Sequence, residues 1–316
     1  MKILIVAGKH TGSNLFCSPA IRLIRQQLSG SFIDVVSLNK LSAEVFNGNP
    51  DIDRLHVTQK TRAVKKLTGN ADIALCLNPK SLDLLADAEC PVYSVPNFSI
   101  ETHQADAILE FTAATLGLEM KESIRRYVIA SGTLPESLQN QNDNLIGLHL
   151  GCGKTAKHGW KFFHSGRGSH QKLWPLERYI ELSQLITETY PSHRLVITGT
   201  HNEAFLARQF LKAQPNAISL IGQTSARSLF TSIEHMDAFI SHDCGVLHIA
   251  AATSTPIVSL FASTFPEQTG PYPASPHRIV LKASSMTEIP AQDIMVRLKR
   301  FIPVINPWPR QTLAQG

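Results

Sequence analysis

Cysteine is scarce in this sequence of 316 residues, and no two cysteines form a C-x-x-C pair. Zinc sites, iron–sulfur clusters and redox dithiols need closely spaced cysteines. The chain has an odd number of them at wide spacings: Cys17, Cys76, Cys90, Cys152 and Cys244. We therefore expect free thiols and no metal site built on cysteine.

Long apolar runs are also missing. No stretch reaches the length of about 18 apolar residues that a membrane-spanning helix needs. The opening MKILIVAG is a short apolar segment with no small-residue cleavage site after it, unlike a signal peptide. We expect a soluble protein of the cytoplasm, and contact with the inner face of the membrane stays open.

Aromatic residues make up only 7% of the chain, and no basic motif is interleaved with them. This disfavours nucleic acid as a partner. The formal net charge of +5 is compatible with an acidic ligand such as a nucleotide or a phosphorylated glycan. One basic run, Lys60, Arg62, Lys65 and Lys66, predicts either an exposed helix face or a contact with an anionic glycolipid.

Short apolar runs rich in β-branched residues alternate with helical patterns, which predicts strands followed by helices. The predicted strands are Lys2–Val6, Ile33–Leu38, Asp72–Leu77 and Val92–Val95 in the first half, and Leu145–Leu150, Arg194–Thr198, Ile218–Ile221, Ala238–Ser241 and Ile257–Phe261 in the second. Helical patterns lie near 176–190, 202–213, 225–235 and 245–252. The alternation favours α/β domains with parallel, doubly wound sheets, and the length allows two of them.

Turn-forming residues without hydrophobic periodicity fill Ser131–Asn144, which predicts an interdomain linker. We place the first domain at 1–143 and the second at 144–290. The remaining segment, 291–316, holds a helical pattern over Ala291–Ile302 that fits against either domain.

The connection Gly151–Trp174 is long for a compact domain and follows a predicted strand. Ligands of open α/β sheets bind at the carboxyl ends of strands, so we interpret this loop as functional. His149, His158, His164 and His170 lie in or beside it. No pair of histidines four residues apart accompanies a carboxylate there, and we expect no metal.

The strongest functional signal is the segment Asp243-Cys-Gly-Val-Leu-His-Ile-Ala-Ala-Ala252, where an apolar strand ends and a helix of small residues begins. The first amides of such a helix are free to bind an anion. Gly245 allows a phosphate to approach closely, and His248 can donate a hydrogen bond to it. The alternative is an ordinary turn in which Asp243 caps the helix and His248 is buried and hydrogen-bonded.

This segment resembles the D-[ST]-G-x-x-H-x-A-A-A signature of the heptosyltransferase-like glycosyltransferases, family 9. The strand Pro256–Phe261 and then Ser263-Thr-Phe-Pro266 follow it, as in that family. Further matches, in the family's order, are Ser18-Pro-Ala-Ile-Arg-Leu-Ile24, His149-Leu-Gly-Cys152, Lys172-Leu-Trp-Pro175 and Leu220-Ile-Gly-Gln-Thr-Ser225. Several weak motifs in register over nearly the whole chain are more specific than any one of them.

The resemblance implies the GT-B fold, with two facing Rossmann-like domains and a C-terminal helix that crosses back to the first. It implies an inverting, metal-independent glycosyltransferase without a cofactor. Such an enzyme moves a heptose or hexose from an ADP- or UDP-sugar, held by the C-terminal domain, to a lipopolysaccharide core or another anionic surface glycan, held by the N-terminal domain.

The donor contacts of the family carry over to matching positions of this chain. The diphosphate would meet Lys172, the amides of Cys244, Gly245 and Val246, and His248, while Asp243 would shape the turn. Gly151 and Cys152 match the stretch at the distal phosphate and sugar, Thr224 lies where the base pocket is lined, and Glu203 is a weaker candidate for the ribose hydroxyls. Amides and lysines that offset the charge of the departing diphosphate make a metal unnecessary.

In the first domain, the loop Gly8–Asn14 follows the opening strand and should face the interdomain cleft. We expect the next helix to begin with Ser18 as N-cap and Pro19 as its first residue. The family carries in this loop an aspartate that takes the proton of the acceptor hydroxyl. The matching residue here is Ser13, and serine cannot act as a general base near pH 7 unless another group first accepts its proton.

Three explanations of this substitution stay open. His10 supplies the base, a phosphate or carboxylate of the acceptor supplies it, or the chain is a non-catalytic GT-B protein that binds nucleotide sugars. Lys9, His10, Arg22 and Arg25 together predict a basic acceptor patch, and a solvated helix face is the alternative for the two arginines.

Other enzyme classes on a similar fold are disfavoured. A nicotinamide oxidoreductase needs G-x-G-x-x-G after a strand, and neither Gly8–Gly12 nor Gly151–Gly153 supplies it. A sugar-nucleotide epimerase would need carboxylates in the cleft that the sequence does not identify.

Overall fold

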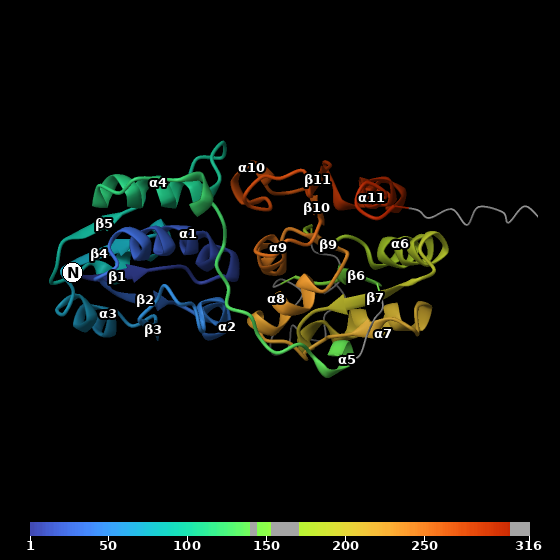
Figure 1. Cartoon of the computed structure of the whole chain (residues 1–316), viewed down its shortest axis with the longest axis horizontal. Coiled ribbons are helices and arrows are strands. Elements are labelled where there is room, and N and C mark those ends of the chain that lie inside the picture. Colours follow the sequence, from blue (N-terminus) through green and yellow to red (C-terminus); the bar gives the residue numbers. More distant parts are fainter. Residues whose placement is uncertain (140–143, 153–170, 304–316) are drawn as a thin grey trace, which may run out of the picture.

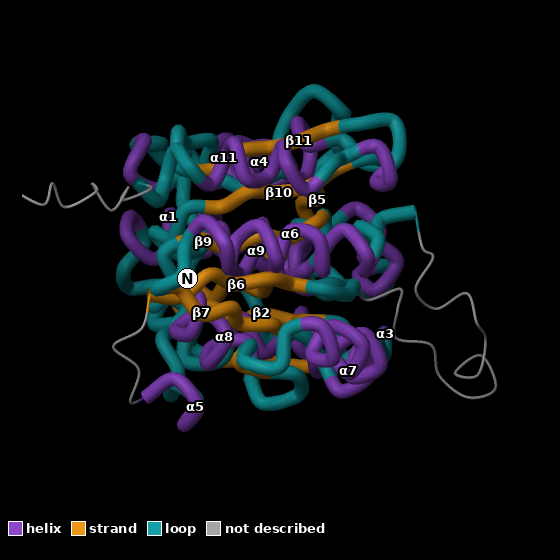
Figure 2. Tube along the Cα trace, turned by 90° about the vertical axis from the view of Figure 1, so that its right-hand side faces the viewer, coloured by secondary structure: helices purple, strands orange, loops and turns teal. Residues whose placement is uncertain are grey.

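The computed structural model describes residues 1–139, 144–152 and 171–303 of the chain. Two α/β domains lie side by side, and every strand pairing in them is parallel (Figure 1). Helices lie on both faces of each sheet (Figure 2). The predicted doubly wound α/β architecture is therefore confirmed.

The first domain holds a five-stranded sheet of order β3-β2-β1-β4-β5. Its strands are β1 (Lys2–Val6), β2 (Phe32–Ser37), β3 (Arg54–Val57), β4 (Ile73–Cys76) and β5 (Val92–Ser94). The helices are α1 (Thr11–Gln27), α2 (Lys40–Ala43), α3 (Thr61–Thr68) and α4 (Gln104–Leu116), with 3-10 turns η1 (Glu44–Phe46), η2 (Pro79–Leu85) and η3 (Glu122–Ile124).

The second domain holds a six-stranded sheet of order β11-β10-β9-β6-β7-β8. Its strands are β6 (Asn144–His149), β7 (His193–Thr198), β8 (Ile218–Ser219), β9 (Ala238–His242), β10 (Ile257–Phe261) and β11 (Arg278–Lys282). The helices and 3-10 turns are α5 (Glu136–Gln139), α6 (Leu176–Thr189), η6 (His201–Glu203), α7 (Ala204–Ala213), α8 (Ala226–Glu234), α9 (Gly245–Ala251), α10 (Pro266–Thr269), η7 (Met286–Glu288) and α11 (Ala291–Leu298).

The edge strands β3 and β11 were not predicted. Both are partly exposed along their length, so they lack the continuous apolar run of a central parallel strand. The central strands instead bury both faces. In β1, Ile3 and Ile5 pack in the cluster that includes α1 and α4, whereas Leu4 and Val6 pack in the cluster that includes α3.

The apolar core on the α1 side continues from one domain into the other. Leu15 and Phe16 of α1 belong to the same buried cluster as Leu247 and Ile249 of α9. The two domains therefore meet through packed side chains at α1 and α9, which fixes where their strand ends face each other.

The chain crosses between the domains upstream of the predicted boundary near 143. The Val128 amide donates to Ser18 Oγ of the first domain at 3.1 Å. The Gly132 amide already donates to Thr231 Oγ1 of α8, in the second domain, at 2.9 Å. The crossing thus lies within residues 129–131 (Figure 1).

The C-terminal helix does not cross back to the first domain, so this implication of the family resemblance is wrong for α11. Ile294, Met295 and Leu298 are buried in the core that the second domain builds around α6, and Figure 1 shows α11 beside α6. Residues 304–316 lie outside the described part of the chain. Within the described residues, no helix is both long enough and apolar enough to cross a bilayer.

Helix α1 begins eight positions before the predicted start, so the prediction of Ser18 as N-cap is wrong. His10 is the N-cap, and Pro19 lies inside the helix. Proline has no amide to bond the carbonyl four residues earlier, and the buried Ser18 hydroxyl donates to that carbonyl, Leu15 O, at 2.7 Å. Ser13 consequently lies in the first turn of a helix, not in a loop.

Replacing Ser18 with alanine should lower the free energy of unfolding by about 1–3 kcal/mol, because two buried backbone groups would lose their partner. Urea denaturation measures this loss. Ser29→Ala, at an exposed position after α1, is the matched control. Equal stability of the two variants would show that the Ser18 hydroxyl adds nothing to the fold.

Candidate functional site

The switch point of the second sheet lies where β6 and β9 end side by side, and open α/β sheets bind ligands at such points. The rings of His149 and His242, which end these strands, stack at 5.8 Å. The Tyr179 hydroxyl donates to His149 O at 2.7 Å and lies 3.1 Å from His242 Nδ1. All three side chains are buried, so they form a rigid polar floor.

Lys172 and Asp243 meet at the edge of this floor. Lys172 precedes α6, and its Nζ lies 2.5 Å from Oδ2 of Asp243, the residue after β9. The carboxylate is almost fully buried, whereas about a third of the lysine side chain is exposed, at 8% and 32%. The ion pair therefore holds an accessible cation in place at the switch point.

Cys244, not Asp243, is the N-cap of α9, so the alternative in which Asp243 caps this helix is wrong. Gly245 and Val246 form the first turn of the helix and are partly exposed. Their predicted contact with a diphosphate stays a prediction.

The start of α9 lies against the start of α1. A Cβ added to Gly12 would lie 2.6 Å from His248 Cδ2, and one added to Gly245 would lie 2.9 Å from Thr11 Cβ. Side chains at these two positions would force the helices apart. The structure thus brings the N-terminal glycine segment and the D-x-G-x-x-H segment together across the interface.

His248 is buried within this contact, with 4% of its surface exposed. Its ring packs edge-on against Phe16 at 4.8 Å and against Tyr127 at 6.4 Å. His248 is thus buried, as the alternative interpretation expects, and among the described atoms its Nδ1 has no hydrogen-bond partner.

The pKa of His248 is lowered to about 4 by burial and by the neighbouring His103 and Lys172, and the attraction of Asp243 does not compensate. The ring is consequently neutral at pH 7. In this structure it joins the two domains, and its predicted contact with a phosphate stays a prediction.

The side chain of Ser13 stabilises the start of α1. Its hydroxyl donates to His10 O at 2.9 Å and accepts from the His10 amide at 3.2 Å. Lys9 and His10 are exposed immediately before the helix. The position at which the family has a carboxylate is thus occupied by a side chain that caps its own helix.

Arg22 and Arg25 form neither the solvated helix face nor a free acceptor patch. Arg22 Nε lies 2.9 Å from Asp51 Oδ2, and Arg25 Nη2 lies 2.5 Å from Asp53 Oδ2. Both arginines therefore hold the segment before β3 against α1. Contact of either one with an acceptor stays a prediction.

The remaining predicted donor residues lie at the ends of β6, β7 and β8. Buried Glu203 accepts from the amide and the hydroxyl of Thr200 and caps η6. It packs beside Gly151, where an added Cβ would lie 2.1 Å from its Oε1. Cys152 is buried, and Thr224 is partly exposed just before α8. His158, His164 and His170 lie outside the described residues.

One polar clamp across the interface has no counterpart in the sequence analysis. The Tyr272 hydroxyl donates to Asp106 Oδ1 at 2.8 Å, and His103 stacks on Tyr272 at 4.7 Å while its Nε2 lies 3.1 Å from Gly270 O. These partners are more than 160 positions apart in the chain. No local pattern could have revealed contacts of that kind.

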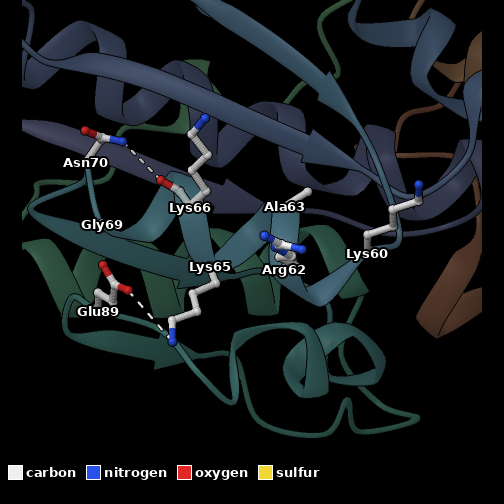
Figure 3. Close-up of a pocket in the computed structure, with 8 residues that line it drawn as sticks. All are labelled: Lys60, Arg62, Ala63, Lys65, Lys66, Gly69, Asn70 and Glu89. Atoms are coloured by element: carbon white, nitrogen blue, oxygen red, sulfur yellow. Dashed lines mark hydrogen bonds and ion pairs between the residues drawn. The ribbon is translucent and has the colours of Figure 1, made fainter.

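A separate pocket of about 620 Å³ lies on α3, lined by Lys60, Arg62, Ala63, Lys65, Lys66, Gly69, Asn70 and Glu89 (Figure 3). The four cations are exposed, and one of them, Lys65, has its Nζ 3.9 Å from Glu89 Oε1. The predicted exposed helix face is thus confirmed. No group of three or more histidine, cysteine or carboxylate side chains in the described ranges could hold a metal ion.

Two Rossmann-like domains whose strand ends face each other across a shared interface define the GT-B class of proteins. The chain belongs to glycosyltransferase family 9, the heptosyltransferase family, whose model matches residues 94–298.

Individual relatives agree with this assignment. The chain is 28% identical over 106 residues to lipooligosaccharide heptosyltransferase 2 of Haemophilus influenzae, and the match covers 32% of this chain and 30% of that protein. The family 9 glycosyltransferase structure of Veillonella parvula superposes with a TM-score of 0.77 at 17% identity, over 95% and 96% of the two chains. Escherichia coli heptosyltransferase WaaC, solved with ADP-2-deoxy-2-fluoro heptose, gives 0.69 at 17% identity, over 95% and 99%.

The stability of the protein should fall on acidification through His248. A histidine whose pKa is lowered by folding binds fewer protons in the native state. The stability that the neutral ring contributes is complete above the pKa of histidine in the unfolded chain, near 6.5, and is lost as the pH falls toward 4. Between pH 7 and pH 4.5 the loss should be about 2–3 kcal/mol.

Urea denaturation at both pH values measures this dependence. His248→Gln should show a smaller loss than the native sequence, and His277→Gln, at an exposed position, should not. Equal losses in all three proteins would contradict a buried neutral His248.

Proposed function

We propose that this protein transfers a heptose or hexose from an ADP- or UDP-sugar to a lipopolysaccharide core or another anionic surface glycan, with inversion and without a metal ion. The observation that carries the proposal is the placement of Lys172. Asp243 holds this cation at the β6–β9 switch point, and the adjoining helix α9 meets the start of α1 from the other domain.

In the proposed reaction, the second domain binds the donor. Lys172 Nζ and the amides of Cys244, Gly245 and Val246 interact with the diphosphate, and their positive ends stabilise the charge that grows on it as it leaves. Glu203 and Thr224 lie further along the same sheet edge, toward the ribose and base. The complex of the related WaaC with an ADP-sugar supports an adenine nucleotide as the first donor to test.

The first domain presents the acceptor. The exposed Lys9 and His10 lie at the start of α1, and the exposed cations of α3 offer a second contact for an anionic glycan. The acceptor hydroxyl attacks the anomeric carbon from the side opposite the diphosphate, which inverts the configuration. The proton of that hydroxyl must go to a base.

Ser13 cannot be this base, because its hydroxyl proton is donated to the carbonyl oxygen of His10, which is not a base. We assign the role to His10, the exposed N-cap of α1. The second candidate function is a nucleotide-sugar-binding protein without transfer activity, and the substitution at Ser13 favours it.

Lys172→Ala should raise the dissociation constant for ADP about tenfold or more and that for adenosine much less, because the lost contact is with phosphate. Isothermal titration calorimetry measures both. The substitution also leaves the Asp243 carboxylate without its cation, which could itself repel ADP. The double variant Lys172→Ala/Asp243→Asn removes that negative charge and should still bind ADP weakly. Lys299→Ala, at an exposed position of the same domain, is the control.

Recovery of ADP affinity in the double variant would show that Lys172 only neutralises Asp243. Equal losses of affinity for ADP and for adenosine would show that Lys172 only supports the fold.

His10→Ala should lower the transfer rate by about 10²–10⁴ while the affinity for the donor stays nearly the same, as expected for loss of a general base. Transfer to a bacterial core oligosaccharide from ADP-heptose measures the rate, and Gln26→Ala, at an exposed position of α1, is the control. If His10→Ala transfers the sugar at the full rate, the base belongs to the acceptor and not to His10. If the native sequence is inactive and Ser13→Asp restores slow transfer, the binding-protein alternative is correct.

A further inference from the structure

The first sheet has a switch point of its own, where the neighbouring strands β1 and β4 end. Strands β2 and β3 extend the sheet on one side of β1, and β4 and β5 extend it on the other. Ligands of open α/β sheets bind at such points. Gly8 lies two residues after β1, and Asn78 lies two residues after β4. These two residues therefore stand where the first domain is arranged to hold a ligand.

Two polar side chains meet beside Gly8. A Cβ added to Gly8 would lie 2.2 Å from Ser13 Oγ and 2.7 Å from Asn78 Nδ2, so the hydroxyl and the amide both approach the face of Gly8 that carries no side chain. Ser13 and Asn78 are partly exposed, whereas Gly8 is buried. The position at which the family has its catalytic carboxylate thus has an asparagine amide as its neighbour.

The orientation of the Asn78 side chain is fixed by the backbone around it. Ser81 Oγ donates to Ala7 O at 3.0 Å, which ties η2 to the end of β1. Asn78 Oδ1 accepts from the Lys80 amide at 3.1 Å and so caps η2. Because Oδ1 is engaged there, Nδ2, on the other side of the amide group, faces Gly8.

The Nδ2 group of Asn78 keeps its hydrogen atoms available for a ligand. Oδ1 accepts from the Lys80 amide, and the main-chain carbonyl accepts from Cys76 Sγ. Within the described part of the chain, no group accepts a hydrogen bond from Nδ2. A partly exposed amide that is held in place, with a donor directed at a switch point, is arranged to bind a ligand oxygen.

The same amide lies on the acceptor side of the proposed reaction. Gly245 belongs to the proposed diphosphate site, and a Cβ added to it would lie 2.9 Å from Thr11 Cβ. Thr11 and Ser13 share the first turn of α1. The path from the diphosphate to Asn78 therefore runs along this turn, past His10, to which the proposed function assigns the base.

We propose that Asn78 binds a hydroxyl of the acceptor sugar through its Nδ2 donor and so determines which hydroxyl of that sugar meets the donor. The proposal rests on the proposed function, because it names a residue of its acceptor side. An amide N–H donates but cannot take a proton, so the hydroxyl that Asn78 binds is a neighbour of the one that attacks. The attacking hydroxyl is then left to give its proton to the base.

Calorimetry of the full chain with a bacterial core oligosaccharide, and separately with ADP, tests the assignment. Asn78→Asp keeps the oxygen that caps η2 but replaces the amide donor with an acceptor. Asn78→Ser keeps a capping hydroxyl without adding charge. Each variant should raise the dissociation constant for the oligosaccharide about three- to tenfold, as expected for one lost hydrogen bond, and leave that for ADP unchanged.

Asn39→Asp is the matched control. Asn39 follows β2, is partly exposed, and caps α2 by accepting from the amides of Leu41 and Ser42, so the substitution adds the same charge at the same sheet edge but away from the switch point. Its affinity for the oligosaccharide should equal that of the native sequence. A loss confined to Asn78→Asp would be an effect of charge, and an equal loss in Asn39→Asp would be an effect of the whole edge. Either result would overturn the proposal.

Monodeoxy analogues of the acceptor sugar identify the hydroxyl that is bound. For one analogue, the native sequence should lose as much affinity as Asn78→Ser loses for the unmodified sugar. That variant should bind this analogue and the unmodified sugar equally, because the same hydrogen bond is missing in both. Additive losses for every analogue would show that Asn78 contacts no hydroxyl.

The two ligands separate this proposal from the function on which it rests. Normal binding of ADP and of oligosaccharide in both Asn78 variants rejects Asn78 and keeps the proposed function. Oligosaccharide binding that depends on Asn78, without ADP binding, supports Asn78 and rejects the donor site. If the native sequence binds ADP but no oligosaccharide, the acceptor class is wrong and the proposal is rejected with it.

Discussion

The contact between the first turns of α1 and α9 determines how the rest of this molecule is arranged. Two glycines make it possible, because Gly12 faces the ring of His248 and Gly245 faces Thr11 at distances that leave no room for a Cβ. The contact brings the carboxyl end of the first sheet to the carboxyl end of the second. Both halves of the proposed reaction depend on that approach, since the acceptor-side and donor-side residues come from different domains.

The same contact buries polar groups without giving them a hydrogen-bond partner. His248 Nδ1 and the Tyr127 hydroxyl have no hydrogen-bond partner among the described atoms, and each such group costs about 1–3 kcal/mol. Aromatic packing around Phe16 and the clamp of Tyr272 on Asp106 offset this cost.

The first turn of α1 explains why the missing carboxylate matters. Ser13 closes the start of the helix through His10, and its side chain lies so close to Gly8 that a Cβ there would be 2.2 Å from Ser13 Oγ. A larger acidic side chain at this position would have to point away from Gly8, toward the interdomain face. Where the family has a group that can accept a proton, this chain has a side chain that stabilises the start of the helix.

The sequence by itself determined the central strands, the alternation of strands with helices, and the order of motifs that identifies family 9. These are local properties, because burial on both faces leaves unbroken apolar runs such as Ile3–Val6. The tertiary structure alone decided the start of α1, where Ser18 compensates for Pro19, the packing of α11 on α6, and the ion pairs that engage Arg22 and Arg25. It also decided that Lys172 pairs with Asp243 and that His149 meets Thr198. Those contacts join residues from different strand ends, and their distances depend on how the sheets twist and pack, which no short sequence pattern records.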